Sequence, residues 1–309
     1  MTFRLTVIGS GSGAPLPGRY TSAQVLNVHE RFVLIDCGEG TQINLRRFGI
    51  NFNRIGLILI SHLHGDHYLG LPGLLNTFHL LGREKELHIA GHRKLKDLLD
   101  YVFGMAGFEP SYPIHFHDID TMQPGDNIDF GEFNVGFFPL KHRIPASGFL
   151  ITERQRTVKI RKDFIEVYEP EYEQVRAILR GEQYFDNNGK EVPAEEMLIQ
   201  PAPPRSYAYV SDTVFDRSIV PFIQGADLLY HETTYDKSLQ ASATEKMHAT
   251  SVDAATIAAE AGVKQLLIGH YSSRYRTPDL LLSEARHIFP ETLAAEDGLQ
   301  LDIPISSGL

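Results

Sequence analysis

The sequence predicts an α/β fold built on a sheet whose faces are covered. A short apolar run at residues 57–60 is typical of a central strand in such a sheet. Leu74, Leu75, Phe78 and Leu81 then recur at helical spacing. With 309 residues, 42% of them hydrophobic, the chain can build one large core, or a core domain that carries an insertion.

The remaining elements follow from apolar runs and turn residues, taken in chain order. We expect strands at residues 3–8, 23–28, 32–36, 55–61, 87–90, 114–119, 127–130 and 133–139, and helices at 42–48 and 93–103. The glycine-rich stretch at residues 9–15 follows the first strand. It is not a dinucleotide fingerprint, because Pro15 and Pro17 prevent the helix that should follow. It is either a plain turn or a loop that approaches a phosphate.

Composition restricts the function classes. The net charge of −10 argues against a generic nucleic-acid binder, although local basic patches can still act. Cys37 is the only cysteine, which excludes an internal disulfide, fits a reducing compartment and suits a small buried apolar residue. The first nine residues are too poor in apolar side chains for a signal peptide, and no apolar run is long enough to span a membrane. We therefore expect a cytoplasmic protein.

The strongest motif follows the apolar run directly. Three histidines and an aspartate, His62, His64, Asp66 and His67, fall within six residues. His62 and His64 lie two apart in extended chain, so both rings can face one side. Asp66 and His67 come where the helix starts and can face a second centre. Imidazole with carboxylate suits zinc, and also manganese or iron. A histidine-rich surface loop is the alternative, but four ligand-type residues behind a buried strand favour a metal site.

Three later strands repeat this arrangement. His142, Asp212 and His270 each follow an apolar run, and the carboxyl ends of strands form one rim of an α/β sheet. A single histidine or aspartate after a strand is usually structural, but three in a chain with the central motif indicate a shared site. The candidate metal ligands are His62, His64, Asp66, His67, His142, Asp212 and His270.

Seven ligands are too many for one tetrahedral zinc and suit two metal ions. In our interpretation Asp212 bridges the ions. One ion is held by His62, His64 and His142, and the other by Asp66, His67 and His270. A water on such a centre has a pKa of about 7, so hydroxide is present at neutral pH, and two cations suit phosphodiester hydrolysis. Asp66 can accept the proton of the attacking water.

Residues 152–205 differ from the rest of the chain. Apolar periodicity is sustained only at residues 172–179, and residues 201–204 read Pro-Ala-Pro-Pro, a stiff linker. We expect a core domain of residues 1–151 and 206–309, and an inserted arm of residues 152–205 that projects from it. A basic patch near its start consists of Arg154, Arg156, Lys159, Arg161 and Lys162. The alternative is that residues 152–205 form a solvent-exposed insertion that binds no partner.

The segment from His62 to His67 resembles the signature of the metallo-β-lactamase fold. A longer match, in the family's order over nearly the whole chain, resembles ribonuclease Z, a family of tRNA 3′-processing endonucleases. The matching pieces are residues 9–13, 36–42 and 61–75, His142 with 148–149, residues 211–213, 231–234 and 248–250, and His270 with Ser272, Arg274 and Tyr275. The resemblance to ribonuclease Z in particular, rather than to the fold in general, rests on residues 70–75, 231–232 and 274–275.

The resemblance implies an αββα sandwich with an inserted flexible arm. It implies two zinc ions per subunit and cleavage that leaves a 3′-hydroxyl on the tRNA. It also implies a homodimer in which the arm of one subunit grips precursor tRNA bound at the other's site, with no membrane partner and no nucleotide cofactor. By the same resemblance, Asp66 accepts a proton, His248 helps protonate the leaving 3′-oxygen, Glu232 orients a neighbour and Arg274 holds a substrate phosphate. We assign substrate binding also to Lys141 and the five cations of the arm.

Two other functions remain open. One is a small-substrate hydrolase of the same fold, a phosphodiesterase, arylsulfatase or thioesterase. The other is a metal-bearing scaffold that binds RNA or protein without catalysis. The basic side chains assigned to substrate binding favour a nuclease over a small-substrate hydrolase. The complete set of seven candidate metal ligands argues against a scaffold without catalysis. Ser211 and Gly269 depart from the family pattern beside two ligands, where neighbouring side chains tune metal affinity or activity. We interpret the remaining histidines as structural: His29, His79, His88, His92, His115, His117 and His287.

Overall fold

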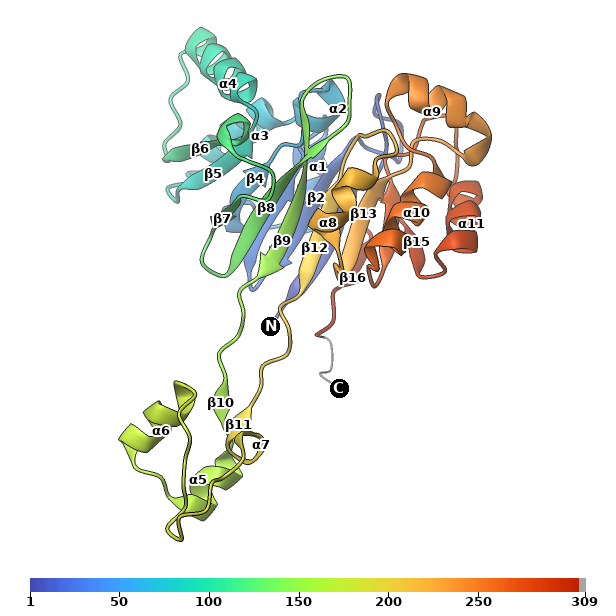
Figure 1. The fold of residues 1–309 in the computed structure, drawn as a ribbon. Helices are drawn as coiled ribbons and strands as arrows, with labels where there is room; N and C mark the ends of the chain where they lie inside the picture. Colours follow the sequence, from blue (N-terminus) through green and yellow to red (C-terminus); the bar gives the residue numbers. More distant parts are fainter. Residues whose placement is uncertain (306–309) are drawn as a thin grey trace. The chain divides into compact units, whose positions relative to one another are not determined.

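The computed structural model describes residues 1–305, and the chain divides into two compact units. Met1–Glu153 and Arg205–Pro304 form the first unit, and Arg154–Pro204 form nearly all of the second. Figure 1 shows that the chain leaves the first unit through β9 and returns to it through β12 (Ala146–Glu153 and Ser206–Val210).

The first sheet is built from the amino-terminal part of the sequence together with one strand from near its carboxyl-terminal end. Among the described residues its strand order is β16-β1-β2-β3-β4-β5-β6. Its strands are β1 Phe3–Gly9, β2 Ala23–Val28, β3 Arg31–Ile35, β4 Ile55–Leu59, β5 Leu87–Gly91, β6 Ile114–Asp118 and β16 Gln300–Asp302. Strands β3 to β6 run parallel to one another, so their carboxyl ends share one edge.

The second sheet has the order β15-β14-β13-β12-β9-β8-β7 within the described chain. Its other strands are β7 Asn127–Asp129, β8 Phe133–Leu140, β13 Leu228–Glu232, β14 Leu266–Gly269 and β15 Thr292–Ala294. Strands β12 to β15 are parallel, whereas β9 runs antiparallel to both β8 and β12. Strand β8 therefore points the same way as β12.

The two sheets pack face to face. Leu57 and Leu59 of β4 lie in one buried cluster with Phe149 of β9 and Tyr209 of β12. Ile58, between the two leucines, points to the opposite face and packs with helices. This alternation is the period-two pattern of a strand that is buried on both sides.

Helices cover the outer face of each sheet (Figure 1). Beside the first sheet lie α1 Thr41–Arg47, α2 Gly65–Tyr68, α3 Leu71–Leu80 and α4 Arg93–Ala106, and beside the second lie α8 Val220–Ile223, α9 Gln240–Lys246, α10 Ser251–Ala261 and α11 Asp279–Ile288. Short 3₁₀ helices occupy Phe52–Arg54, Ile119–Thr121, Arg217–Ile219 and Lys237–Leu239. The result is an αββα sandwich, which confirms the predicted fold class. Within residues 1–305, no helix has both the length and the apolar character to cross a membrane.

The second unit has a small core of its own. Its elements are β10 Lys159–Ile160, α5 Lys162–Tyr168, α6 Tyr172–Leu179, α7 Ala194–Met197 and β11 Leu198–Ile199. Strands β10 and β11 pair antiparallel, and a buried cluster contains Phe164, Ile178, Tyr184, Val192 and Met197. The sequence showed apolar periodicity over α6 but gave no signal for α5, because α5 is short and mixes charged with apolar residues.

Details of the first unit also differ from expectation. Leu81 was predicted to share the buried face of α3, but it follows the last helical residue and is 49% exposed. The strand expected to continue to residue 61 ends at Leu59, so Ser61 and His62 already lie in the loop beyond β4. Cys37 is fully buried, as predicted.

Candidate metal centre

Loops from both sheets converge beyond the carboxyl ends of their strands. His62 and His64 follow β4, and His142 follows β8. Asp212 follows β12, and His270 comes directly after β14. Asp66 and His67 lie in α2, the short helix that begins at Gly65. The structure thus brings all seven sequence-predicted ligands to one end of the sandwich.

The first group of possible metal ligands contains His62, His64, His142 and Asp212. The Nδ1 atom of His64 lies 3.1 Å from Nε2 of His62 and 3.0 Å from Nε2 of His142. The Asp212 Oδ2 atom lies 3.6 Å and 3.8 Å from the same two Nε2 atoms. These four donor atoms all lie within 4.8 Å of one another.

The second group contains Asp66, His67 and His270. The Nε2 atoms of the two histidines are 3.2 Å apart, and Asp66 Oδ2 lies 3.5 Å and 3.3 Å from them. The other Asp212 oxygen, Oδ1, lies 3.4 Å from Nε2 of His67 and 3.2 Å from Nε2 of His270. Asp212 therefore turns one carboxylate oxygen toward each group, and a pair of ions held there would lie on either side of it.

The donor set fits a pair of cations. Among the described residues, Asp212 Oδ1 is buried yet accepts no hydrogen bond, and such an atom is costly unless something pairs with it. Burial and the neighbouring imidazoles lower the pKa of His62 well below its usual range, which favours the neutral form that metals bind. Burial opposes charge on His67, but Asp212, Asp66 and Asp36 outweigh it and raise its pKa well above the usual value. This part of the site therefore favours positive charge.

A set of hydrogen bonds orients the histidine rings. His142 Nδ1 donates to the Met247 carbonyl at 2.8 Å, and His67 Nδ1 donates to Asp36 Oδ2 at 2.8 Å. His270 Nδ1 lies 2.9 Å from Thr234 Oγ1. In these three residues the hydrogen bond occupies one ring nitrogen, which leaves Nε2 directed at the centre.

Asp36 supports the candidate site, although the sequence did not predict a role for it. It is fully buried and also accepts from Ser61 N at 2.8 Å, Ser61 Oγ at 2.9 Å and the Tyr209 hydroxyl at 2.7 Å. Its φ of 56° is unusual for a non-glycine residue, and His270 has a φ of 61°. An aspartate directly after a strand was the available signal, the same one that identified Asp212.

Asp66 has a second contact besides the histidines. The backbone N–H of Gly13 donates to Asp66 Oδ2 at 2.6 Å. Burial raises the pKa of this carboxyl, but His67 and His270 outweigh burial and hold it below the usual range. Asp66 is therefore a carboxylate at neutral pH. The glycine-rich loop after β1 is thus part of the site, because it holds Asp66 with a backbone amide.

Buried Glu232 and partly buried His248 form a pair beside the two ligand groups. The Glu232 carboxylate lies 3.0 Å from His248 Nδ1 and accepts from Ala249 N at 2.8 Å and Thr234 N at 2.9 Å. Burial opposes a charged His248, but Glu232 and then Asp212 outweigh burial and raise its pKa to about 9. His248 Nδ1 is 3.8 Å from Asp212 Oδ2, so this protonated ring lies against the ligand shell.

The predicted substrate-binding cations fall into three settings. The Arg274 guanidinium lies 4.9 Å from the Tyr235 ring centroid, and that ring lies 6.1 Å from the His248 ring. Lys141 forms an ion pair with Asp216 at 3.0 Å, so part of its charge is neutralised. The five arm cations lie in the second unit, where Arg161 is paired with Asp163 at 2.8 Å.

The facing sheets, outer helices and clustered donors define a protein of the metallo-β-lactamase fold whose side chains are able to hold metal ions. Human tRNase Z, short form (ELAC1), superposes with a TM-score of 0.71 at 27% identity, covering 98% of this chain and 100% of that chain. YhfI of Bacillus subtilis, described as a metallo-β-lactamase fold protein, gives a TM-score of 0.69 at 20% identity over 97% and 98% of the two chains, which shows the shared fold alone.

Sequence relatives narrow this class. Ribonuclease Z of Bacteroides fragilis (strain ATCC 25285) is 42% identical over 97% of this chain and 99% of the relative. Ribonuclease Z of Bacteroides thetaiotaomicron is 40% identical over 97% and 95%. A family model described as "Anti-Pycsar protein Apyc1" also matches residues 3–184. The chain belongs to the family of that model. By its full-length relatives it also belongs to the ribonuclease Z family, and this second membership is the one that the sequence resemblance predicted.

Proposed function

We propose that this chain removes the 3′ trailer from precursor tRNA by hydrolysing one phosphodiester bond, and that it uses two zinc ions to do so. Manganese or iron would suit the same donors. The observation that carries the proposal is the position of Asp212, whose two oxygens face two separate groups of histidine and carboxylate donors. When bound there, a pair of ions lowers the pKa of a coordinated water to about 7 and offsets negative charge on the reacting phosphate.

The protein's own groups complete the reaction. Asp66 orients the attacking water and accepts its proton, because its carboxylate stays ionised beside His67 and His270. The new bond joins the water oxygen to phosphorus, and the bond from phosphorus to the tRNA 3′-oxygen breaks. His248 gives its proton to that leaving oxygen, while Glu232 keeps the ring protonated and oriented. The products are a tRNA with a 3′-hydroxyl and a trailer with a 5′-phosphate.

Substrate binding involves groups outside this centre. Arg274, stacked on Tyr235, is available to hold a phosphate next to the cut. The second unit, with its cations, serves as the tRNA-binding arm, and the basic residues bind the RNA backbone in a salt-dependent way. A homodimer in which the arm of one subunit serves the other's site, and a cytoplasmic location, belong to the same proposal.

The test is to incubate zinc-loaded protein with a 3′-extended tRNA and with a small phosphodiester, and to map any cut at nucleotide resolution. We expect one cut after the nucleotide that precedes the trailer, with a 3′-hydroxyl on the tRNA. Hydrolysis of the small diester without cleavage of the tRNA would instead indicate the small-substrate phosphodiesterase that the sequence left open.

The same assay tests Asp66. We expect Asp66→Ala to lower the single-turnover cleavage rate by about 10²- to 10⁴-fold, the usual contribution of a positioned acid or base. Metal content by mass spectrometry separates a lost ligand from a lost proton acceptor. Asp100→Ala, which removes an exposed carboxylate from α4, is the matched control and should cleave normally. Near-normal turnover by Asp66→Ala would remove Asp66 from the mechanism.

A further inference from the structure

The end of the first sheet opposite the candidate metal centre is also hollowed. A cavity of about 670 Å³ opens at the amino-terminal ends of β3, β4 and β5, where Arg31, Gly56 and His88 contribute to its wall. His62 follows the other end of β4, so the length of that strand, roughly 16 Å at its usual rise per residue, separates the cavity from the candidate metal centre. Ligand pockets usually enclose about 300–1,000 Å³, so the volume suits a small molecule.

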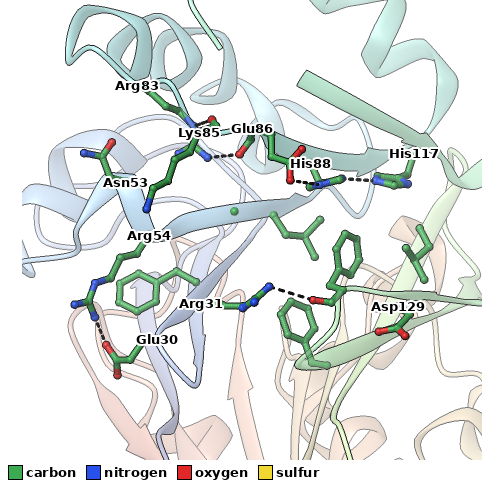
Figure 2. A pocket seen from close by; sticks show the side chains of 16 residues that line it. Glu30, Arg31, Asn53, Arg54, Arg83, Lys85, Glu86, His88, His117 and Asp129 are labelled. Atoms are coloured by element: carbon green, nitrogen blue, oxygen red, sulfur yellow. Dashed lines mark hydrogen bonds and ion pairs between the residues drawn. The ribbon is translucent and has the colours of Figure 1, made fainter. Parts of the chain in front are cut away.

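The positive charge in the cavity is only partly neutralised. Arg54 is paired with Glu30, and buried Arg83 donates to the backbone carbonyls of Lys85 and Glu86. In contrast, Arg31 donates only to a backbone carbonyl, that of Phe130, at 3.4 Å. Within the described part of the chain, neither Arg31 nor Lys85 forms an ion pair with a carboxylate. In Figure 2, Lys85 extends from the Arg83 side of the pocket toward Arg54, and Arg31 lies across its lower part.

The cavity also has an aromatic wall. The partly buried Phe130 ring meets the rings of His88 and His117 edge to face, with centroids 5.5 Å and 5.7 Å away. His88 Nδ1 lies 2.9 Å from His117 Nε2 (Figure 2). Burial lowers the pKa of both histidines, so both rings are neutral at neutral pH. Gly56 leaves the space beside its Cα open, because no heavy atom lies within 4 Å of where a Cβ would be.

We infer that this cavity binds a free nucleotide, with Arg31 and Lys85 holding its phosphate and the Phe130 ring contacting its base. Guanidinium and ammonium groups are the usual partners of a phosphate, and neutral aromatic rings stack on bases. Glu30, Glu86 and Asp129 also line the cavity. These carboxylates repel a polyanion, which favours a single nucleotide over a continuous RNA strand. The nucleotide is a ligand and takes no part in the cleavage.

Calorimetric titration of the full-length protein tests this inference. The probes are AMP, GMP, CMP and UMP, with adenosine, inorganic phosphate and a five-nucleotide RNA as comparisons. Each is titrated into zinc-loaded and into chelator-treated protein. We expect at least one nucleotide to bind with one-to-one stoichiometry whether or not metal is present. Adenosine and inorganic phosphate should each bind at least about tenfold more weakly than the nucleotide. Adenosine lacks the phosphate contacts, and phosphate lacks the contacts to the base.

Charge-reversal variants of two lining residues test whether the nucleotide binds in the cavity. Lys85→Glu and Arg31→Glu should each weaken nucleotide binding by about tenfold or more, as expected when a charge-assisted contact is reversed. Both variants should retain normal thermal melting and normal trailer cleavage. Lys94→Glu, an exposed lysine of α4 outside the cavity, is the matched control and should bind normally.

Three results would overturn the inference. These are unchanged binding by both cavity variants, loss of binding when metal is removed, and tighter binding of the RNA than of any mononucleotide. The second result would place the nucleotide at the metal centre, and the third would make the cavity an RNA-docking site. None of them bears on whether precursor tRNA is cleaved, so the proposed function stands or falls separately.

Discussion

At the residue scale, the ring nitrogens of the site have divided roles. In His67, His142 and His270 one nitrogen is engaged by Asp36, the Met247 carbonyl or Thr234, and the other faces the centre. This arrangement fixes each ring before any ion binds, so little conformational entropy is lost on binding. These three rings are therefore preorganised by residues outside the candidate ligand set.

The Glu232–His248 pair leads us to predict how the rate of trailer cleavage depends on pH. His248 must be protonated to protonate the leaving oxygen, so trailer cleavage should fall as pH rises through its pKa of about 9. Glu232→Gln removes the main group that raises this pKa. The alkaline decline should then move to lower pH, toward the ordinary histidine value of about 6.5. The measurement is the single-turnover cleavage rate from pH 6 to pH 10.

A substrate whose leaving oxygen needs no proton is the control for this prediction. A p-nitrophenyl phosphodiester releases a stable anion, so its pH profile should be the same for Glu232→Gln and the unaltered protein. A tRNA cleavage profile that does not move in Glu232→Gln would remove His248 from the role of proton donor.

Gly269 has a steric reason for departing from the family pattern. A Cβ at this position would lie 2.5 Å from the Tyr230 ring and hydroxyl. Tyr230 is buried and stacks on Tyr209 with centroids 5.0 Å apart, so it cannot move aside. We expect Gly269→Ala to lower the free energy of unfolding by about 1–3 kcal/mol, as overpacking does. Urea denaturation followed by circular dichroism measures the change.

A double-mutant cycle isolates this contact. In a Tyr230→Leu background, Gly269→Ala should cost little, because the clashing ring is absent. Gly104→Ala, on α4 where nothing lies within 4 Å of the added Cβ, should not destabilise the protein. Equal costs of Gly269→Ala in both backgrounds would refute the steric explanation.

The candidate ligands could be proposed from the sequence because their signal is local. His62, His64, Asp66 and His67 are contiguous, and His142 or Asp212 can be identified by its place after a strand. The hydrogen bonds that orient the rings could not be predicted in the same way. The Met247 carbonyl, for example, meets His142 across 105 residues of chain. Such a contact depends on how the sheets pack, which a single sequence does not encode locally.

At the scale of elements, the sheets were easier to predict than the arm. The central strands are apolar on both faces, and their predicted bounds differ from those observed by only one or two residues at either end. The helix α5 was missed, because its seven residues bury only Phe164. A single anchoring residue gives no periodicity, so tertiary packing rather than pattern decides that helix.

A buried ion pair joins β9 to β12 where the chain leaves the first unit. Arg205 donates to Glu153 through Nε at 2.9 Å and Nη2 at 2.8 Å, and through Nη1 to the Ile303 carbonyl at 3.0 Å. Glu153 and Arg205 are only 2% and 3% exposed. Arg205→Ala removes the arginine from the buried Glu153 carboxylate, which also contacts His29 at 2.9 Å, and should lower the free energy of unfolding by about 3–5 kcal/mol.

Urea denaturation of the unaltered protein, Arg205→Ala and Arg217→Ala tests this prediction. Arg217→Ala is the matched control, because it removes an exposed arginine whose partner is Glu260. It should cost no more than about 1 kcal/mol. Similar costs for the two variants would mean that burial of the Arg205 pair contributes nothing particular to stability.

At the scale of the whole molecule, two units with separate cores indicate two separable tasks. The first unit contains every candidate ligand, together with Glu232 and His248. The second has its own apolar cluster and paired strands, so its core is built from its own side chains. The backbone pairing of Thr152 with Ser206 brings the two chain exits next to each other in the first unit. A short linker can therefore replace the arm without stretching the core.

Replacing residues 157–201 with a short glycine-serine linker tests this division. The variant should melt cooperatively and hydrolyse a small phosphodiester at the normal rate, because the ligands and their supporting residues are intact. Its kcat/KM for precursor tRNA should fall by at least about tenfold through a higher KM, since the lost contacts hold substrate rather than the reacting phosphate. The remaining tRNA cleavage should also depend less steeply on salt. Equal loss of both activities would mean instead that the second unit supports the fold of the first, and that the arm is not a separate RNA-binding element.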